Sequence, residues 1–294
     1  MKFLNYGSIN IDLVFSVDHM VKPGETISST GLEKSAGGKG ANQSAALAKA
    51  GATVFHGGKI GSDGRFLVDL LKDYGVDTSF VREYEGATGQ ALIQLDKNRQ
   101  NAIVLFGGGN HQIMQSEIDE TLMHFEEGDM LVLQNEIVNG SYLITQAKAK
   151  GMKVCLNTAP FDENLRHLPL SKVDILVMNE IEGASLAGIE TEKSFKVILE
   201  KLVEDYPDSE IVLTVGKAGV YYGYREVRLH EPIYDIPVVD TTAAGDTFIG
   251  YFLASRAKGY STQETLAYSC KASGLAVSKN GAMASIPFAS EVFC

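Results

Sequence analysis

The sequence predicts a three-layer α/β domain, in which a mainly parallel β-sheet lies between two layers of helices. Short apolar runs of strand length alternate along the chain with longer segments of helical spacing. Several of these longer segments end in glycine, as helices commonly do. Two further pairs of apolar runs fall outside the alternation, and they predict a small second sheet.

The alternating segments follow one another over most of the chain. The expected strands are short and apolar: 53–60, 129–135, 152–157, 174–179 and 210–216. The expected helices are 40–51, 64–75, 141–151 and 193–206. Ligands of such parallel sheets bind beyond the carboxyl ends of the strands. The glycines and polar residues that follow these strands are therefore candidates for the functional site.

The second sheet is expected from two hairpins. Residues 91–106 are two apolar runs around a polar turn, and residues 11–34 are a weaker pair punctuated by VKPGET. We expect them to pair and to project from the main domain as a lid, with lid segments at about 11–36 and 88–110. No linker, repeat or low-complexity segment divides the chain, so residues 1–294 are expected to form a single domain.

Composition limits the partners and the location. The formal net charge is -11 and the chain has no run of Lys or Arg, so no nucleic acid is expected. Cys155, Cys270 and Cys294 lie far apart without CxxC spacing, which favours a reducing compartment and argues against a zinc site. The amino terminus lacks a secretory signal pattern, and no segment approaches the ~20 apolar residues that cross a bilayer. We expect a cytoplasmic protein with no membrane partner.

The stretch DTTAAGDTFIGYF, residues 240–252, places Asp246 between a glycine and a run of apolar helix formers. An acidic residue at a helix start is usually a cap for the first N–H groups. Alternatively, the small residues before it leave those N–H groups open to an anion, and Asp246 faces a reacting hydroxyl. This stretch alone leaves both interpretations open.

The stretch AGGKGANQSAALAKAG, residues 36–51, is a glycine turn that leads into a helix of small residues. It is not a Walker A loop, because Gly40 follows Lys39. It is not a GxGxxG fingerprint either, because Gln43 holds the third glycine position, and this disfavours an NAD dehydrogenase. The glycines form an ordinary tight turn, or they let the backbone approach a polyhydroxylated ligand while Lys39 and Asn42 supply hydrogen-bonding groups.

Together, GGKGANQ and DTTAAGDTF resemble the two signature stretches of the ribokinase family of ATP-dependent sugar kinases. The resemblance covers essentially the whole chain, because six further motifs stand where family counterparts are expected: GSINID, PGET, LQNE, MNEIEG, TVGKAG and GAMASIP. It implies the ribokinase-like three-layer fold with a lid sheet. The AAGD form of the second signature, where many relatives carry GAGD, is closest to the family members that act on D-ribose.

The resemblance also implies roles for residues that match the family motifs. The sugar hydroxyls would be held by Asn10, Asp12, Gly38, Lys39, Asn42 and Glu136, together with Asp246. Asp12 and Glu136 suit vicinal diols, since each carboxylate can accept two hydroxyl hydrogens. Asp246 would be the catalytic base. The hole for the transferring phosphoryl group would be formed by the backbone N–H groups of Ala243, Ala244 and Gly245.

ATP, Mg²⁺ and a monovalent cation are implied in the same way. Asn179 and Glu182 match an NxxE element that orders phosphate and magnesium, and the nucleotide-side loop is matched by Thr214, Gly216 and Gly219. K⁺ would lie beside the anion hole, held mostly through backbone carbonyls at Asp240, Thr242, Ala276, Lys279, Gly281 and Ser285. Taken singly, such residues are more often strand ends, turns or solvated charges. Their joint placement after predicted strands favours the functional interpretation.

The expected activity is Mg²⁺-requiring, ATP-dependent phosphorylation of a small sugar, with D-ribose at its 5-hydroxyl as the first choice. The alternatives are another family substrate (deoxyribose, fructose or a nucleoside) and a non-catalytic sugar-binding regulator, which would need no base. The helix N-terminus is expected to favour the charged form of Asp246, with capping as a by-product. The lids of two subunits are expected to pair as a homodimer.

Overall fold

The computed structural model describes residues 1–98, 100–190 and 194–293. The strands of the main sheet in these ranges are β1 (Phe3–Tyr6), β4 (Val54–Ile60), β5 (Asp77–Glu83), β8 (Met130–Gln134), β9 (Lys153–Asn157), β10 (Ile175–Asn179), β11 (Glu210–Thr214), β12 (Val220–Tyr224) and β13 (Val227–Glu231). Their spatial order is β13-β12-β11-β10-β9-β8-β1-β4-β5. In this order, the neighbouring strands β11, β10, β9, β8, β1, β4 and β5 all pair in parallel. Strands β12 and β13 add an antiparallel edge beside β11.

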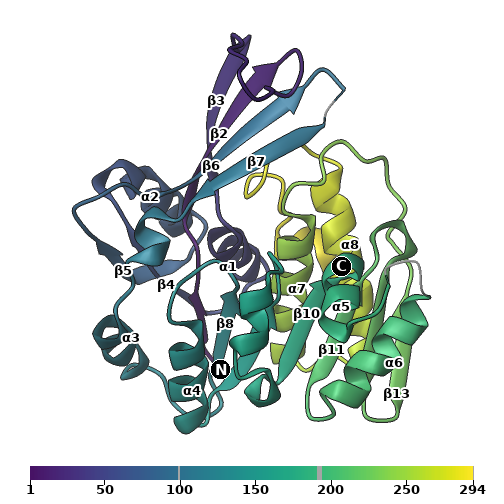
Figure 1. Ribbon diagram of the computed structural model, residues 1–294. Coiled ribbons are helices and arrows are strands. Elements are labelled where there is room, and N and C mark those ends of the chain that lie inside the picture. Colours follow the sequence, from purple (N-terminus) through teal and green to yellow (C-terminus); the bar gives the residue numbers. More distant parts are fainter. Residues whose placement is uncertain (99, 191–193, 294) are drawn as a thin grey trace.

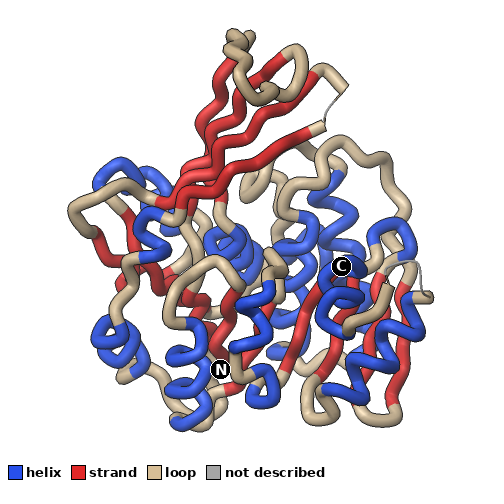
Figure 2. The backbone as a smooth tube through the Cα atoms, in the orientation of Figure 1, coloured by secondary structure: helices blue, strands red, loops and turns tan. Residues whose placement is uncertain are grey.

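Helices cover both faces of this sheet (Figures 1 and 2). One face packs against α1 (Lys39–Lys49), α2 (Arg65–Asp73), α7 (Ala244–Ala257), α8 (Thr262–Val277) and the short α9 (Ala289–Val292). The other face packs against α3 (Gln115–Leu122), α4 (Gly140–Ala149), α5 (Glu180–Ala187) and α6 (Phe195–Asp205). The connections contain the 3-10 turns η1 (Ser62–Gly64), η2 (Gly108–His111), η3 (Glu163–His167), η4 (Leu170–Lys172) and η5 (Gly216–Ala218).

The observed layers confirm the predicted three-layer α/β fold and its mainly parallel sheet. Every strand and helix expected from the alternating pattern is present, with ends that shift by a few residues. Lys193, the first residue of the helix expected at 193–206, lies outside the described residues, and so does Cys294. Cys155 and Cys270 are buried free thiols. Within the described ranges, no helix combines the length and the apolarity that a membrane span requires.

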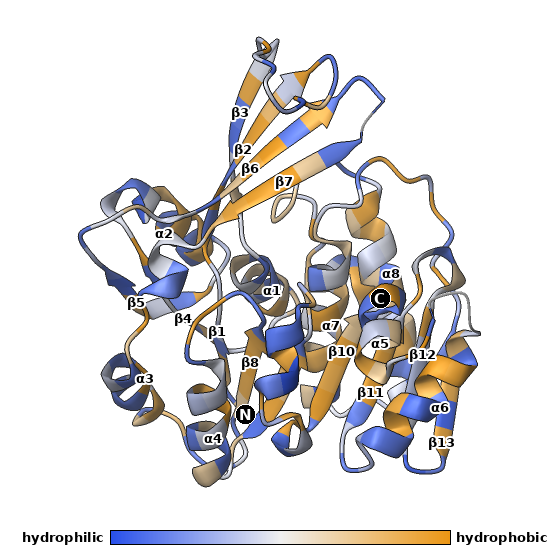
Figure 3. Ribbon diagram, viewed as in Figure 1, coloured by the Kyte–Doolittle hydropathy of each residue, from blue (hydrophilic) through white to orange (hydrophobic). Residues whose placement is uncertain are grey.

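The central strands are apolar throughout because both of their faces are covered. Figure 3 shows β8, β10 and β11 in hydrophobic colours, and every residue of β8 is buried. The outer helices are amphipathic instead. In α6 the buried residues are Ile198, Leu199, Leu202 and Val203, which recur at helical spacing on one side.

The predicted small sheet is also present. It contains β2 (Asn10–Val17), β3 (Gly31–Gly37), β6 (Gly89–Asp96) and β7 (Asn101–Phe106) in the order β3-β2-β6-β7, and it stands away from the layered body in Figure 1. Each expected hairpin is an antiparallel pair, and β2 and β6 join the two pairs in parallel. Arg99, in the connection between β6 and β7, lies outside the described residues.

Helices α1 and α7 approach each other very closely at Ala46 and Gly250. A Cβ atom on Gly250 would lie 2.4 Å from the Cβ of Ala46 and 2.9 Å from backbone atoms of α1, so only glycine fits there. Asn42 and Asp246 each lie one helical turn before this contact, on the same faces of their helices. The close contact therefore brings the side chains of Asn42 and Asp246 together.

Substituting Gly250→Ala tests this contact. The added methyl group has no space, so we expect the free energy of unfolding in urea to fall by about 1–3 kcal/mol. Gly140→Ala is the matched control, because a Cβ atom there would lie 3.5 Å from its nearest neighbour, Leu168. That variant is expected to be unchanged or slightly more stable. Equal stability of the two variants would contradict the tight fit of α1 against α7.

Candidate active site

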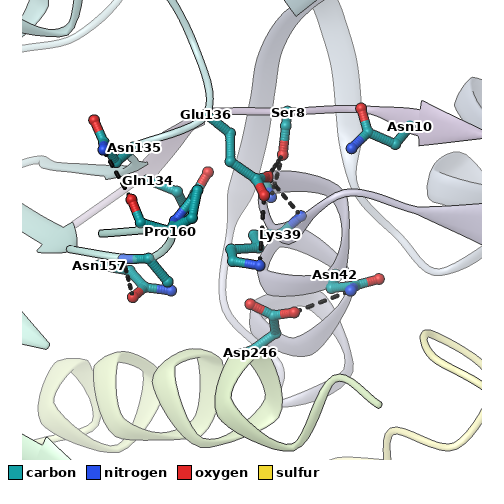
Figure 4. Close-up of polar contacts among 12 residues, drawn as sticks. Ser8, Asn10, Lys39, Asn42, Gln134, Asn135, Glu136, Asn157, Pro160 and Asp246 are labelled. Atoms are coloured by element: carbon teal, nitrogen blue, oxygen red, sulfur yellow. Dashed lines mark hydrogen bonds and ion pairs between the residues drawn. The ribbon is translucent and has the colours of Figure 1, made fainter. Parts of the chain in front are cut away.

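The buried carboxyl group of Asp246 faces helix α1. Its Oδ2 accepts a hydrogen bond from Nδ2 of Asn42 at 2.9 Å, and its Oδ1 accepts one from Nε2 of Gln43 at 2.9 Å. Figure 4 shows the contact with Asn42. Ala243 is the N-cap residue of α7, and no side chain caps this helix. The expected capping by Asp246 is therefore wrong, because both of its oxygens are turned toward α1.

The start of α7 leaves several backbone N–H groups open. Ala243 has a left-handed backbone with φ of 59°, which is unfavourable for a residue with a side chain. Among the described residues, the N–H groups of Ala243, Gly245 and Asp246 have no backbone acceptor, and that of Ala244 reaches the carbonyl of Thr241 at 3.3 Å. With the positive end of the helix dipole behind them, these groups provide what an anion site requires.

Burial raises the pKa of Asp246, although the charge of Lys39 and the hydrogen bonds from Gln43 and Asn42 act in the opposite direction. Desolvation outweighs these opposing contributions, so the net shift runs opposite to the direction expected from the helix N-terminus. A raised pKa makes an ionised carboxylate a better proton acceptor.

Lys39, at the start of α1, lies between two carboxyl groups. Its Nζ is 3.4 Å from Oε1 of Glu136, and its backbone N–H donates to Oε2 of Glu136 at 3.3 Å. Ser8 Oγ donates to the same Oε2 (Figure 4). Burial disfavours the charged form of Lys39, but Glu136 and Asp246 outweigh burial and raise its pKa. Lys39 therefore stays cationic within reach of both acidic groups.

Asp12 projects from β2 against Gly37, the last residue of β3. A Cβ atom on Gly37 would lie 2.1 Å from Oδ2 of Asp12, so glycine is needed to leave room for the carboxyl group. Burial and the charge of Glu136 raise the pKa of Asp12 to about 6, while Lys39 lowers it. The ionised form is therefore costly unless a donor arrives to pair with it.

Asn10 and Gly38 complete the predicted sugar-binding set. Asn10 shares a face of β2 with Asp12, since the two residues are two positions apart. Gly38 has φ of 93°, and a Cβ atom there would lie 2.9 Å from the backbone N of Asn10. The structure thus gathers six of the seven predicted residues at the base of the small sheet and the start of α1, and the seventh, Asp246, contacts Asn42 from α7. Their contact with a sugar remains a prediction.

A cavity of about 330 Å³ opens at the carboxyl ends of the central strands, where parallel sheets bind ligands. Its wall combines the start of α7 with polar residues from α1, α5 and the strand ends: Lys39, Asn157, Asn179, Glu182, Thr214 and Ala243 to Asp246. The predicted base, phosphoryl hole and NxxE element therefore share one cavity.

Asn179 and Glu182 form a capping box at the start of α5. Oδ1 of Asn179 accepts from the N–H groups of Ile181 and Glu182, each at 2.9 Å. Oε2 of Glu182 accepts from the N–H of Asn179 at 3.0 Å and from Oγ1 of Thr158 at 3.3 Å. Burial raises the pKa of Glu182. Within the described ranges its Oε1 accepts no hydrogen bond, which leaves one carboxylate oxygen for a ligand.

The predicted nucleotide-side residues lie at and beside the cavity. Thr214 ends β11 and lines the wall, with its Oγ1 donating to the carbonyl of Met178 at 3.3 Å. Gly216 begins the η5 turn and Gly219 directly follows it, with φ of 50° and 90°. A Cβ atom on Gly219 would lie 2.1 Å from the carbonyl oxygen of Glu231, so the turn depends on this glycine.

The predicted cation ligands come from segments that meet at the end of α8. Oδ1 of Asp240 accepts from the N–H and the Oγ1 of Thr242 at 2.9 and 2.7 Å, and its Oδ2 accepts from the N–H of Gly281 at 3.0 Å. The N–H of Asp240 in turn donates to the carbonyl of Val277 at 3.1 Å. These bonds hold the 240–242 turn against residue 281.

The other predicted cation ligands lie in the same region of the chain. The N–H of Lys279 donates to the carbonyl of Ala276 at 3.2 Å, and Oγ of Ser285 donates to the carbonyl of Ala282 at 2.9 Å. In the described part of the chain, no group of three His, Cys, Asp or Glu side chains could hold a metal ion.

Three polar residues of this site, Ser8, Gln43 and Asn110, are not among those predicted from the sequence. Gln43 directly follows Asn42 in the first signature, so a second amide beside Asn42 could have indicated that Gln43 also belongs to the site. Ser8 reaches Glu136 across 128 positions, and Asn110 reaches Asn10 across 100 positions. Neither contact leaves a local pattern in the sequence.

A buried carboxylate beside an open helix N-terminus, at the carboxyl ends of a parallel sheet, is an arrangement suited to phosphoryl transfer onto a hydroxyl group. The chain belongs to the pfkB family of carbohydrate kinases, which matches residues 2–289. The resemblance inferred from the two signature stretches is thereby confirmed.

Within this family the chain is similar to several ribokinases. The ribokinase of Staphylococcus aureus (strain COL) is 35% identical over 99% of this chain and 98% of its own length. The crystal structure of ribokinase from Cryptococcus neoformans var. grubii serotype A in complex with ADP has a TM-score of 0.88 and 34% identity, covering 99% and 98% of the two chains. Arabidopsis thaliana ribokinase complexed with ribose and ATP has a TM-score of 0.86 and 30% identity, covering 99% and 97%.

The raised pKa of Asp12 predicts a stability effect. A carboxyl pKa of about 6, against an ordinary 3.8, means that the folded state binds more protons than the unfolded state between these values. Stability therefore falls as the pH rises through this window. We expect Asp12→Asn to raise the free energy of unfolding by about 1–3 kcal/mol at pH 7 and to change it little near pH 4.

Urea denaturation of the ligand-free protein at both pH values measures this effect. Asp18→Asn is the control, because Asp18 is an exposed carboxylate just past the same strand, and we expect it to change stability little at either pH. A destabilised Asp12→Asn variant at pH 7 would contradict the assigned cost of the buried charge.

Proposed function

We propose that this carbohydrate kinase transfers the terminal phosphoryl group of ATP to the 5-hydroxyl of D-ribose. The observation that carries the proposal is the buried Asp246 carboxyl, held by Asn42 and Gln43 beside the open N–H groups of Ala243 and Gly245. The ribokinase relatives, including the one complexed with ribose and ATP, support D-ribose over deoxyribose, fructose or a nucleoside.

The proposed sugar ligands are Asn10, Asp12, Gly38, Lys39, Asn42 and Glu136. Asp12 accepts hydrogen bonds from two neighbouring hydroxyls, which relieves the cost of its buried charge. Glu136 accepts further hydroxyl hydrogens, and Lys39 donates to sugar oxygens. Gly38 lets the backbone come close to the ligand, because it carries no side chain.

In the proposed reaction the 5-hydroxyl lies against Asp246. The oxygen of the 5-hydroxyl forms a bond to the γ-phosphorus, while the bond from that phosphorus to the β,γ-bridging oxygen breaks. The proton of the 5-hydroxyl passes to Asp246. Asn42 and Gln43 fix the orientation of the carboxyl group and leave lone pairs for the hydroxyl. The N–H groups of Ala243, Ala244 and Gly245 stabilise the charge of the group in transfer.

We propose a magnesium-binding role for Asn179 and Glu182. The site fits this ion, because Glu182 lines the cavity with one carboxylate oxygen that accepts no hydrogen bond in the described ranges, and Mg²⁺ prefers oxygen ligands. Thr214, Gly216 and Gly219 would form the nucleotide side. When bound, the ion neutralises charge on the phosphates.

K⁺ is the proposed monovalent cation at the turn beside the phosphoryl hole. The donors would be backbone carbonyls and side-chain oxygens, a set that suits K⁺. They are Asp240, Thr242, Ala276, Lys279, Gly281 and Ser285. The hydrogen bonds of Asp240 support this proposal, because they hold two of the contributing segments together directly before Ala243.

We further propose that the small sheet is a lid that excludes water from the reaction, and that two lids pair in a homodimer. Strand β7 lies at the edge of the sheet, and its last four residues, Ile103 to Phe106, are apolar side chains that are each more than half exposed. On β3, at the opposite edge, Leu32 is 62% exposed. Apolar surface of this kind favours contact with another protein surface. The free thiols support the expected cytoplasmic location.

The substrate is tested by coupled assay of ADP formation with D-ribose, 2-deoxyribose, fructose and a nucleoside. We expect the highest kcat/KM with D-ribose, and a value about tenfold lower with 2-deoxyribose, because Asp12 loses a hydroxyl partner. A better rate with another sugar would overturn the choice of ribose alone. No acceleration by any of them would overturn the kinase proposal and favour a sugar-binding regulator.

Asp246→Asn tests the proposed base. The amide cannot accept the proton, so we expect kcat to fall by about three or more powers of ten while the Kd values for sugar and ATP change little. The variant should fold, because Oδ1 of Asn42 has no partner and that amide can rotate to accept from the new NH₂ group. A kcat near that of the unmodified protein would refute the role.

A further inference from the structure

We propose that Asn110 is a positioning residue that fixes Asn10 as a hydrogen-bond donor to the sugar. Asn110 lies in η2, directly after β7, and is 2% exposed, while Asn10 begins β2 and is 6% exposed. Nδ2 of Asn110 donates to Oδ1 of Asn10 at 2.7 Å. This inference rests on the proposed function in one respect, that Asn10 contacts the sugar.

The orientation of both amides follows from one backbone group. The N–H of Ile9 can only donate, and it donates to Oδ1 of Asn110 at 3.0 Å. Asn110 must therefore turn its Nδ2 toward Asn10, and Oδ1 of Asn10 must accept this hydrogen bond. Nδ2 of Asn10 is then left for the ligand. In Figure 4 the amide nitrogen of Asn10 points to the side of Lys39 and Asp246, and its oxygen points away from them.

A donor is what the sugar needs at this position. Asp12 lies on the same face of β2 and, as a carboxylate, can only accept hydrogen bonds. A hydroxyl that gives its hydrogen to Asp12 has lone pairs that remain to be satisfied. Nδ2 of Asn10 can supply a hydrogen to them, whereas an Asn10 with a rotated amide would place a second acceptor beside Asp12.

Gly89 leaves the space in which the two amides meet. A Cβ atom on Gly89 would lie 2.3 Å from Oδ1 of Asn10 and 2.3 Å from Nδ2 of Asn110. Gly89 is the first residue of β6 and pairs with Asn10 across the sheet. A side chain at this position would separate the two amides without adding a charge or removing a hydrogen-bonding group.

The main test is Asn110→Asp. The aspartate keeps an oxygen for the N–H of Ile9 but offers a second acceptor to Asn10, so the amide of Asn10 must rotate. We expect the Kd for D-ribose, measured by calorimetry, to rise about tenfold, as for one lost hydrogen bond. The Kd for ATP and the kcat at saturating sugar should stay within about twofold, which a general loss of structure would not allow.

Gly89→Ala is the second variant, and it keeps the proposal testable if the new buried carboxylate prevents folding. It should raise the Kd for D-ribose in the same way. Asn101→Asp is the matched control, since it makes the same substitution at an exposed site on β7, and it should leave the Kd unchanged. If both Asn110→Asp and Gly89→Ala bind D-ribose as the unmodified protein does, the proposal is overturned.

Asn10→Ala shows whether the effect passes through Asn10. We expect it to raise the Kd for D-ribose, and we expect Asn110→Asp to add nothing further in that background. An equal further rise would overturn the positioning role. An unchanged Kd in Asn10→Ala alone would instead remove Asn10 from the proposed sugar ligands, and the inference with it. No D-ribose binding by the unmodified protein would overturn the proposed function itself.

Discussion

The close approach of α1 and α7 is the constraint on which the site depends. Gly250 allows the backbones to meet at Ala46, and one turn earlier this places Asp246 against two amides of α1. Helix α1 is pressed equally closely onto the connection between β1 and β2, because a Cβ atom on Gly40 would lie 2.5 Å from the backbone N of Ser8. The glycines at both contacts thus keep α1 close to α7 and to the connection after β1, and any side chain at these positions would push these elements apart.

These close contacts bury more acidic charge than the ligand-free protein can pair well. Burial raises the pKa of Asp12 and of Asp246, and Lys39 is the cation that lies near both, with Glu136 competing for it. The hydrogen-bond donors that would satisfy these groups are those of a polyhydroxylated ligand. The sugar-binding role proposed for Asp12 would therefore be in conflict with stability, as is common where a site is organised ahead of its ligand.

The fold could be predicted from the sequence because strands covered on both faces leave apolar runs, and the hairpins of the small sheet carry their own turn signals. Local sequence also placed Asp246 at a helix start. It could not show that the carboxyl group turns to Gln43, 203 positions away, or that burial would raise its pKa. The NxxE stretch is a capping box that local sequence could have shown.

The small sheet is anchored at the end where the candidate sugar ligands lie. Three residues separate β1 from β2, and Gly38 alone separates β3 from α1. Strand β2 has eight residues, so at a rise of about 3.3 Å per residue its last residue lies about 23 Å from its first. The sheet is thus a lever with Asn10 and Gly37 at its fulcrum. A rotation of the sheet about this end would therefore move its tip much farther than it moves the residues beside Asn10 and Gly37.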